Sequence, residues 1–263
     1  MIGNQRRREI CELLKKQSAV TTTALSERFG VSVETIRKDL LELEKAGELE
    51  RVHGGAVQKP YVQETRTFSQ RLESMVASKR EISQTAVNLI KNGDIIAIDT
   101  GSTAREFIEA VKEKFDRLTI VTHARDVFEA ACDYKNFQVI LCGGFYLKEE
   151  KAFYGDFAMN MLDNIRVGRA FIFPNSISLS NGIYDDNSLL SHMQRKLIAC
   201  ANEVVVVADS SKFEKSSLIK VANTSPKYTY ISDSLLSEEI KEIYRNNDIH
   251  IVTKAEELPK IGD

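Results

Sequence analysis

After residue 93, short apolar runs alternate with longer amphipathic runs, and this alternation constrains the fold more than any other feature of the sequence. The apolar runs are rich in Val and Ile, as β-strands are, and they lie at 94–99, 118–122, 138–142, 170–173, 203–208, 228–232 and 249–253. The amphipathic runs have the apolar spacing of helices, and they lie at 105–115, 124–133, 189–201 and 237–247. The alternation predicts an α/β domain with a mainly parallel sheet.

Polar and glycine-rich segments follow four of these predicted strands. In parallel sheets, ligands bind at the carboxyl ends of the strands, so we predict that the four segments share a pocket. The candidate residues are Asp99, Gly101, Ser102 and Thr103 after the first strand, Thr122 and His123 after the second, Gly143 and Gly144 after the third, and Asp209 and Lys212 after the fifth. Residues 99–103 precede a predicted helix and offer backbone N–H groups and hydroxyls to an anion. The alternative is that these segments are ordinary turns.

Residues 30–47 predict a helix in the N-terminal part of the chain. Ser32 is suited to cap its first turn, and Gly47 is suited to end it in a left-handed conformation. Apolar residues recur at steps of three and four and predict one buried face, formed by Val33, Ile36, Leu40 and Leu43.

Two further helices are predicted at 6–17 and 21–29, and only a short turn separates the second from the helix just described. This spacing is typical of a helix-turn-helix, with the motif at about 20–39. Thr35, Arg37 and Lys38 lie outside the apolar stripe, where such a helix presents residues to the major groove. The alternative is an amphipathic helix whose charged face is only solvated.

Residues 48–57, ELERVHGGAV, predict a tight hairpin, or wing, after this helix. Its central residues are Arg51, His53, Gly54 and Gly55. A wing can lay Arg51 and His53 along the phosphates of a duplex. For His53, a plain surface position is an equal alternative.

Charge does not mark the whole chain as a nucleic-acid binder. The formal net charge of the 263 residues is -2, and the first 57 residues carry 10 Lys and Arg against 9 Asp and Glu. Any positive face must therefore be local, and the candidates are Arg37 and Lys38 on the helix and the cluster of Arg6, Arg7 and Arg8 near the N-terminus.

The four cysteines show no C-x-x-C spacing and no clustered histidines, so neither a zinc site nor a disulfide framework is predicted. We expect no metal and no cofactor. No stretch has the length of a signal peptide core or of a membrane span, so we expect a cytoplasmic protein without membrane contacts.

Residues 31–57, VSVETIRKDLLELEKAGELERVHGGAV, resemble the winged helix-turn-helix of the DeoR family of bacterial transcription regulators, through both helix and wing. The resemblance implies that Ser32 and the wing glycines belong to a surface that binds a double-stranded DNA operator. The later segments resemble the family's effector-sensing domain, which is similar in fold to ribose-5-phosphate isomerase and binds phosphorylated sugars or related metabolites.

Matches to that family's pattern continue through the second half of the chain. The matching positions are Phe68, Arg71, Lys79, Gly93, Asp94, Asp99, Gly101, Thr103, Thr122, Gly143, Gly144, Gly155, Phe171, Gly182, Asp209, Ser211 and Lys212. The departures are Ser102, His123, Arg169, Pro174, Asn175, Leu190, His192 and Gln194. We expect the departures to cluster on one side of the pocket, so that the anion-binding loop at 101–103 is kept while the part that contacts the rest of the effector differs.

The expected organisation is a winged helix-turn-helix at 1–57, a linker at 58–78 and an effector-binding and oligomerisation domain at 79–263. The expected function is a sequence-specific transcriptional regulator, a repressor of carbohydrate or related metabolite genes, controlled by a phosphorylated small molecule. A lone winged helix has a small footprint on DNA, so we expect a homodimer or homotetramer.

Two alternatives remain open at this point. In the first, the chain is a sugar-phosphate isomerase-like enzyme with a DNA-binding head, and Asp99, Asp209 and Lys212 serve as acid, base and anchor. We expect no catalytic residues, because the acidic and Lys positions usual on the helix after Gly182 are absent. In the second alternative, the C-terminal domain only oligomerises.

Overall fold

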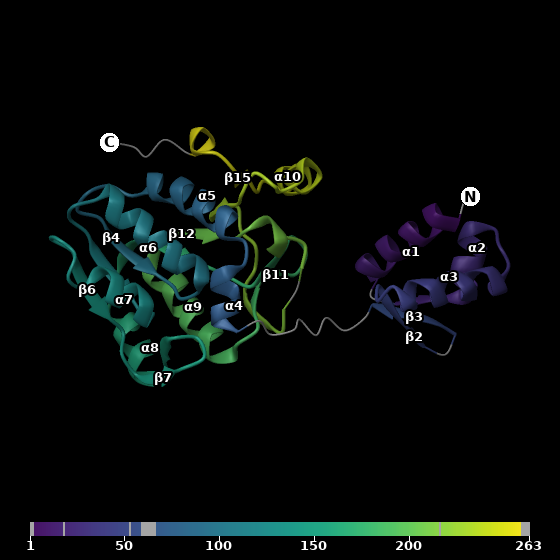
Figure 1. Cartoon of the computed structure of the whole chain (residues 1–263), viewed down its shortest axis with the longest axis horizontal. Coiled ribbons are helices and arrows are strands. Elements are labelled where there is room, and N and C mark those ends of the chain that lie inside the picture. The colour runs from purple at the N-terminus through teal and green to yellow at the C-terminus, as the bar shows by residue number, and fades with distance from the viewer. Residues whose placement is uncertain (1–2, 18, 53, 59–66, 216, 259–263) are drawn as a thin grey trace. The chain divides into compact units, whose positions relative to one another are not determined.

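The computed structural model describes residues 3–17, 19–52, 54–58, 67–215 and 217–258. The chain divides into two compact units, Met1–Thr65 and Arg66–Asp263 (Figure 1). The sequence assigned 58–78 to a linker, but the helix Phe68–Glu73 and the start of the helix Val76–Ala86 fall in this range and belong to the second unit. Among the described residues, no helix has the length and hydrophobicity needed to cross a membrane.

The first unit is a winged helix-turn-helix. Its elements are α1 (Gly3–Gln17), β1 (Ala19–Thr21), α2 (Thr22–Phe29), α3 (Val33–Lys45), β2 (Leu49–Val52) and β3 (Gly55–Gln58). The strands form an antiparallel sheet in the order β1-β3-β2, so the predicted hairpin is present. Gly30 has a φ of 63° and ends α2, and Gly47 has a φ of 80° just after α3. Both backbone conformations favour glycine.

One apolar cluster holds this unit together. It contains Ile10, Leu14, Val20, Leu25, Ile36, Leu40, Leu43, Leu49 and Ala56. Three of the four residues in the predicted stripe of α3 are therefore buried, while Val33 at the start of the helix is only half-buried. Each fully buried Leu or Ile contributes roughly 1.5–3 kcal/mol relative to an exposed side chain. The stripe fixes which face of α3 remains on the surface.

The second unit begins with α4 (Phe68–Glu73) and α5 (Val76–Ala86). The next elements are β4 (Ile95–Ile98), α6 (Ser102–Lys114), β5 (Thr119–Thr122), α7 (Arg125–Ala131), β6 (Gln138–Leu141), β7 (Phe145–Leu147), β8 (Ala152–Tyr154), α8 (Asp156–Asp163) and β9 (Val167–Ile172). The last are β10 (Ser176–Ser178), β11 (Gly182–Asp185), α9 (Ser188–Cys200), β12 (Ala201–Val207), β13 (Ile219–Ala222), β14 (Thr229–Ile231), α10 (Glu238–Arg245) and β15 (Ile251–Val252).

The seven strands predicted from the sequence form one 7-stranded sheet in the order β15-β14-β12-β9-β4-β5-β6. Every neighbouring pair in it is parallel, which confirms the predicted α/β architecture. From β4 the chain adds β5 and β6 toward one edge, and from β9 it adds β12, β14 and β15 toward the other. The strand order therefore reverses between β4 and β9, where open α/β sheets bind their ligands.

Helices cover both faces of this sheet (Figure 1). Ile96 and Ile98 of β4 belong to an apolar cluster that includes side chains of α5, α6 and α7. Ala97, between them, belongs to the opposite cluster, which includes side chains of α8, α9 and α10. Strands that are buried on both faces read as continuous apolar runs, which is why these seven could be predicted from the sequence.

Other elements of the second unit were not predicted. They are the β7–β8 hairpin, the sheet β10-β11-β13, and the helices α4 and α8. Their strands have three or four residues, and β7 and β10 include exposed or serine positions, so neither a long apolar run nor a clear alternation marks them.

Candidate functional site

Side-chain hydrogen bonds fix the first turn of α3 in the first unit. The Ser32 side chain accepts a hydrogen bond from the Thr35 backbone N–H at 3.2 Å, as predicted for a helix cap. The Ser32 and Thr35 hydroxyl oxygens lie 2.9 Å apart. Both side chains therefore help to fix the first turn, and Ser32 is exposed.

Arg37 and Lys38 lie on the exposed face of α3. Arg37 forms an ion pair with Glu34 at 3.2 Å, but their side chains are 60% and 69% exposed. An exposed pair of this kind contributes little stability, so Arg37 can leave Glu34 at small cost. The guanidinium is thus available to a partner that approaches the helix.

Backbone contacts hold the wing against the start of α2. The Gly54 carbonyl accepts hydrogen bonds from the Thr22 backbone N–H at 2.8 Å and from its hydroxyl at 3.0 Å. A Cβ added to Gly55 would lie 2.1 Å from the Val20 carbonyl oxygen, so only glycine fits there. Arg51 is exposed and lies 3.7 Å from Glu44. His53 lies outside the described residues.

Two of the three arginines near the N-terminus pair with acidic side chains of α3, while the third, Arg8, is exposed. Arg6 is buried and its Nε lies 2.6 Å from the Asp39 carboxylate, also buried, on α3. Arg7 forms ion pairs with Glu42 and with Asp39. These arginines join α1 to α3 and are neutralised there, because a buried carboxylate needs a cation.

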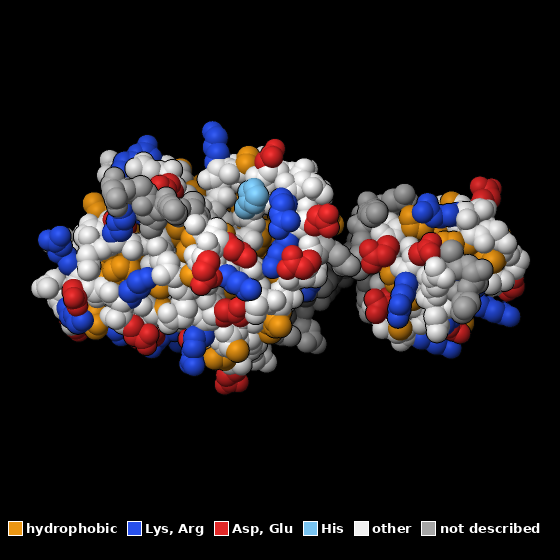
Figure 2. Space-filling view, turned by 90° about the horizontal axis from the view of Figure 1, so that it is seen from above, with side chains coloured by type: hydrophobic (Ala, Val, Ile, Leu, Met, Phe, Trp, Pro, Cys, Tyr) orange, Lys and Arg blue, Asp and Glu red, His pale blue; other side chains and the backbone are white. Residues whose placement is uncertain are grey.

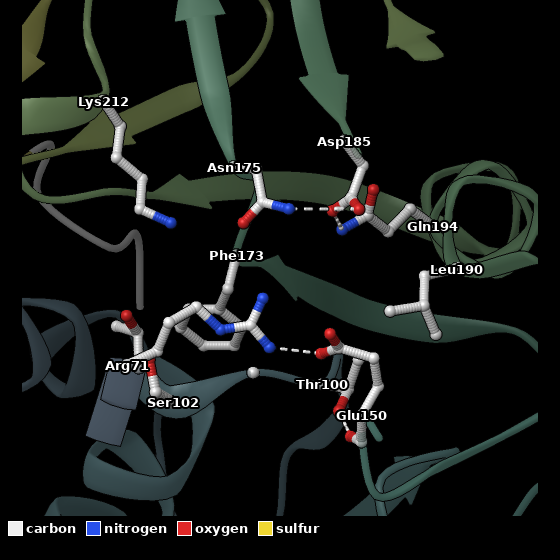
Figure 3. A pocket seen from close by; sticks show the side chains of 12 residues that line it. Arg71, Thr100, Ser102, Glu150, Phe173, Asn175, Asp185, Leu190, Gln194 and Lys212 are labelled. Atoms are coloured by element: carbon white, nitrogen blue, oxygen red, sulfur yellow. Dashed lines mark hydrogen bonds and ion pairs between the residues drawn. The ribbon is translucent and has the colours of Figure 1, made fainter. Parts of the chain in front are cut away.

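The second unit contains a cleft at the reversal point of the sheet (Figure 3). About 380 Å³ of space lies between its walls, and part of this space is open solvent. Its lining residues are Arg71, Thr100, Gly101, Ser102, Thr103, Glu150, Phe173, Asn175, Asp185, Leu190, Gln194 and Lys212. The cleft thus draws on α4, the carboxyl ends of β4 and β9, the turn before β8, β11, α9 and the segment after β12.

One end of the cleft is suited to an anion. Gly101, with a φ of 127°, precedes α6, and no side chain caps this helix start. The backbone N–H groups of Ser102 and Thr103 belong to the first turn of α6, whose intrahelical bonds begin with Arg105 N–H to Gly101 O. A helix N-terminus carries partial positive charge, and the Lys212 side chain lines the same cleft.

Arg71 reaches the cleft from α4 and forms an ion pair with Glu150. Lys79 of α5 supports it: its buried ammonium donates hydrogen bonds to the Arg71 and Ser74 carbonyls. Burial lowers the pKa of Lys79 to about 8, and the Lys212 charge lowers it in the same direction. Lys79 is therefore a positioning residue for the turn that presents Arg71.

The other end of the cleft is acidic. Asp185 is buried, and it accepts hydrogen bonds from Asn175 Nδ2 at 3.2 Å, the Asn187 backbone N–H at 3.0 Å and Gln194 Nε2 at 3.2 Å. Burial raises the pKa of Asp185 to about 6. Gln194 Nε2 also donates to Asp99 at 2.9 Å, so this amide bridges two buried carboxylates.

Asp99 and His123, both predicted to contact an effector, lie behind the cleft lining. Asp99 is fully buried and accepts hydrogen bonds from the Phe173 N–H and Gln194, and its Oδ1 lies 3.0 Å from His123 Nε2. The other ring nitrogen of His123 lies 2.9 Å from the Phe153 carbonyl oxygen. These residues therefore orient the lining residues Phe173 and Gln194 rather than line the cleft themselves.

Three further predicted residues, Thr122, Gly144 and Asp209, have structural contacts in the described chain. The buried Thr122 hydroxyl donates to the Ile98 carbonyl at 2.7 Å and joins β5 to β4. Gly144 lets β8 approach, since an added Cβ would lie 2.4 Å from the Tyr154 carbonyl oxygen, and Gly143 is not among the lining residues. Asp209 caps the turn that carries Lys212. Of the four predicted strand ends, only those after β4 and β12 supply residues that line the cleft.

The departures from the family pattern do not all lie on one side of the pocket. Asn175, Leu190 and Gln194 line the cleft. Arg169 instead forms ion pairs with Asp94 at 3.3 Å and Glu203 at 2.7 Å. Because Asp94 precedes β4, that cluster is at the opposite end of the strands. His192 is exposed and is not among the lining residues. The expected clustering at the pocket therefore holds for only some of the departures from the family pattern.

Eight lining residues were missing from the predicted set. They are Arg71, Thr100, Glu150, Phe173, Asn175, Asp185, Leu190 and Gln194. Four of these carried a sequence signal: Arg71 matched the family pattern, while Asn175, Leu190 and Gln194 departed from it. Glu150 and Asp185 carried none, because the hairpins that bring them to the cleft were not predicted.

Surface charge is mixed, in agreement with the small net charge. On the face shown in Figure 2, Lys and Arg side chains are interspersed with Asp and Glu side chains over both units. Among the described residues, no group of three or more His, Cys, Asp and Glu side chains is arranged to hold a metal ion.

Comparison with protein families identifies both units. Residues 6–59 match the DeoR-like helix-turn-helix domain, and residues 74–234 match the DeoR C terminal sensor domain. The chain belongs to the DeoR family. It is therefore a transcriptional regulator with a helix-turn-helix and a sensor domain, and the resemblance noted in the sequence is confirmed.

Two relatives align over most of their length with this DeoR-family chain. The L-fucose operon activator of Haemophilus influenzae is 30% identical over 249 residues, which cover 95% of this chain and 99% of the relative. The transcriptional repressor AccR of Agrobacterium fabrum is 32% identical over 232 residues, which cover 87% of this chain and 89% of the relative.

Among solved structures, ribose 5 phosphate isomerase A from Neisseria gonorrhoeae is similar to part of this chain. The likeness covers 51% of this chain and 52% of that one, with 17% identity and a TM-score of 0.38. A likeness of this size does not extend to activity.

Proposed function

We propose that this regulator is a sequence-specific repressor of carbohydrate or related metabolite genes, controlled by a phosphorylated sugar or similar metabolite in the cleft. The observation that carries the proposal is the uncapped start of α6, which meets Lys212 and Arg71 at the reversal point of the sheet. Such a start binds phosphate through backbone N–H groups. The name of one relative, an L-fucose operon activator, supports control by a sugar and leaves the direction of control to experiment.

The DNA partner in this proposal is a double-stranded operator read by α3. Arg37 and Lys38, with Thr35, contact base edges or adjacent phosphates from the exposed face of the helix. Arg51 contacts phosphates from the wing, and Gly54 and Gly55 set its shape. The support is the exposure of Arg37, Lys38 and Arg51 on a helix and a wing whose other faces are buried.

A homodimer or homotetramer completes the proposal, because two heads are needed to bind repeated half-sites. Support comes from exposed apolar side chains on β7 and α8. Phe145 and Phe157 are 62% and 70% exposed, far more than is usual for phenylalanine. Sedimentation of Phe157→Asp tests this part: the variant is expected to lose the wild-type assembly, and an unchanged assembly speaks against this surface.

We propose no catalytic role for the cleft. Asp99 is occupied by three hydrogen bonds, and Asp209 by the cap it forms, so neither is free to transfer protons to a ligand. The α9 side chain that touches both Asp99 and Asp185 is Gln194, an amide that neither accepts nor releases a proton near neutral pH.

The proposal is tested by DNA affinity with and without a panel of phosphorylated sugars and polyols, using the DNA that the full chain enriches from a random pool. An effector is expected to change affinity by about 5- to 150-fold. Lys212→Met should abolish the change, and Lys215→Met, an exposed lysine outside the cleft, should keep it.

Calorimetry of the same panel on the wild type and on Ser102→Ala then asks whether the loop at 101–103 holds the anion. Weaker binding to Ser102→Ala is expected, because Ser102 lines the cleft at the start of α6 and its hydroxyl can donate to a phosphate oxygen. If a ligand binds tightly and neither Ser102→Ala nor Lys212→Met changes its affinity, the effector binds outside this loop.

A further inference from the structure

Two opposite charges line the cleft without an ion-pair partner among the described residues: Lys212 and Asp185. The Lys212 ammonium donates to the Pro174 carbonyl at 3.1 Å, which gives it no countercharge. Asp185 receives hydrogen bonds only from neutral groups. In Figure 3, Lys212 lies on the side of Arg71 and Ser102, while Asp185 lies on the side of Gln194 and Leu190. The cleft therefore has a cationic end and an acidic end.

The Asp99–His123 pair does not supply a positive charge to Asp185. A carbonyl only accepts hydrogen bonds, so the His123 Nδ1 that faces the Phe153 carbonyl carries a proton. The contact between His123 Nε2 and Asp99 Oδ1 then holds one further proton, on one partner or the other. In both arrangements the pair has no net charge, so it supplies no positive charge to Asp185.

Gln194 provides a second sign that the acidic end is suited to a ligand with hydrogen-bond donors. Its Nε2 is fully used by Asp99 and Asp185, and its side chain lines the cleft. Its Oε1 is buried and has no hydrogen-bond partner within the described chain. A buried acceptor without a donor is costly, so a donor from a ligand would be stabilised there.

We propose that the ligand of this cleft is a phosphorylated primary amine, with its phosphate at Ser102, Lys212 and Arg71 and its ammonium group at Asp185 and Gln194. The inference rests on the proposed function and names the chemical class of its effector. An ammonium group has three donors and a full charge, so it can neutralise Asp185 and also donate to Gln194 Oε1. A hydroxyl at the same place donates once and leaves the carboxylate uncompensated.

The surroundings of Asp185 favour this class of ligand further. Burial raises the pKa of Asp185, because the protein's own groups do not fully compensate its charged form. The buried Leu190 side chain forms the neighbouring wall and excludes water. An ion pair gains strength where water is excluded, so the amine end can discriminate strongly between an ammonium and a hydroxyl group.

Calorimetry on the full chain with three matched pairs of probes tests the inference. The pairs are glucosamine 6-phosphate with glucose 6-phosphate, galactosamine 6-phosphate with galactose 6-phosphate, and phosphoethanolamine with 2-hydroxyethyl phosphate. Inorganic phosphate is the reference for the anion end. In at least one pair, the amine is expected to bind about tenfold tighter or more, a difference of about 1.4 kcal/mol.

Two variants test whether the acidic end of the cleft causes the preference for the amine. Asp185→Asn removes the charge, and Gln194→Lys places an ammonium group beside it, so each should bring the two members of a pair to similar affinity. Asp186→Asn, a neighbour outside the lining, should keep the wild-type preference. Circular dichroism checks that each variant is folded. If Asp185→Asn does not fold, Gln194→Lys alone tests whether the acidic end sets the preference.

Two results overturn the inference. In the first, the hydroxyl member binds as tightly as the amine in all three pairs, while inorganic phosphate still binds; the proposed function then survives alone. In the second, the amine preference persists in both folded variants. If no probe binds, inorganic phosphate included, the anion end fails and the proposed function falls together with the inference.

Discussion

Arg71 of α4 and Glu150 of the turn before β8 form an ion pair across the lining of the cleft. Their side chains are only 21% and 17% exposed, so the pair is largely shielded from solvent. An anionic ligand in this cleft must compete with Glu150 for the Arg71 guanidinium. The pair therefore opposes anion binding, and it joins the first helix of the second unit to the opposite wall.

We predict that Glu150→Gln binds inorganic phosphate more tightly than the wild type, by about threefold or more, because the variant removes both a competitor and a negative charge from the cleft. Titration calorimetry measures the affinity. Glu149→Gln, the neighbouring exposed glutamate, should match the wild type. Equal or weaker binding to Glu150→Gln would show that Arg71 does not contact the anion.

The pH dependence of stability should report the buried Asp185. Burial raises its pKa from 3.8 to about 6, opposed by the hydrogen bond from the Asn187 N–H. The folded state thus holds this proton more tightly than the unfolded chain. Its contribution to stability is present below pH 3.8 and is lost as the pH rises through about 6.

The corresponding loss is about 3 kcal/mol in the free energy of unfolding, at 1.36 kcal/mol per pKa unit. Asp185→Asn removes this titration, so its stability relative to the wild type should rise between about pH 4 and about pH 7. Urea unfolding of both proteins at the two pH values measures the difference. A constant difference across that range would contradict the raised pKa of Asp185.

Arg51 should act on all DNA sequences alike. We predict that Arg51→Ala weakens binding to the selected DNA and to scrambled DNA by similar factors, since phosphate contacts carry no sequence information. The slope of log K against log salt should fall in magnitude by about 0.9 if Arg51 neutralises one phosphate. Fluorescence anisotropy at several salt concentrations measures both quantities. Weaker binding to the selected sequence alone would make Arg51 a base-reading residue.

The sequence predicted the frame of the molecule well, for a physical reason. Strands buried on both faces, such as β4 and β12, need continuous apolar runs, and α3 needs one apolar stripe, so each leaves a local pattern. Gly30 and Gly47 mark the ends of helices because each adopts a positive φ.

The cleft could be predicted only in part. Ser102 and Lys212 follow long strands and were found, whereas Glu150 and Asp185 reach the cleft from short hairpins without a clear pattern. The partners of Asp99 could not be deduced either, because His123 and Gln194 are 24 and 95 residues away in the chain. Tertiary contacts also reversed one expectation: the Arg6 side chain is bound to Asp39 in the core rather than presented on the surface.

Base reading by Arg37 of α3 is measured through the affinity of the full chain for DNA that the wild type enriches from a random pool. Arg37→Ala is expected to lose about 1 to 3 kcal/mol of discrimination between that DNA and a scrambled sequence. Glu34→Gln, which removes the ion-pair partner of Arg37, should bind at least as tightly as the wild type. Unchanged discrimination in a folded Arg37→Ala variant would contradict base reading by Arg37.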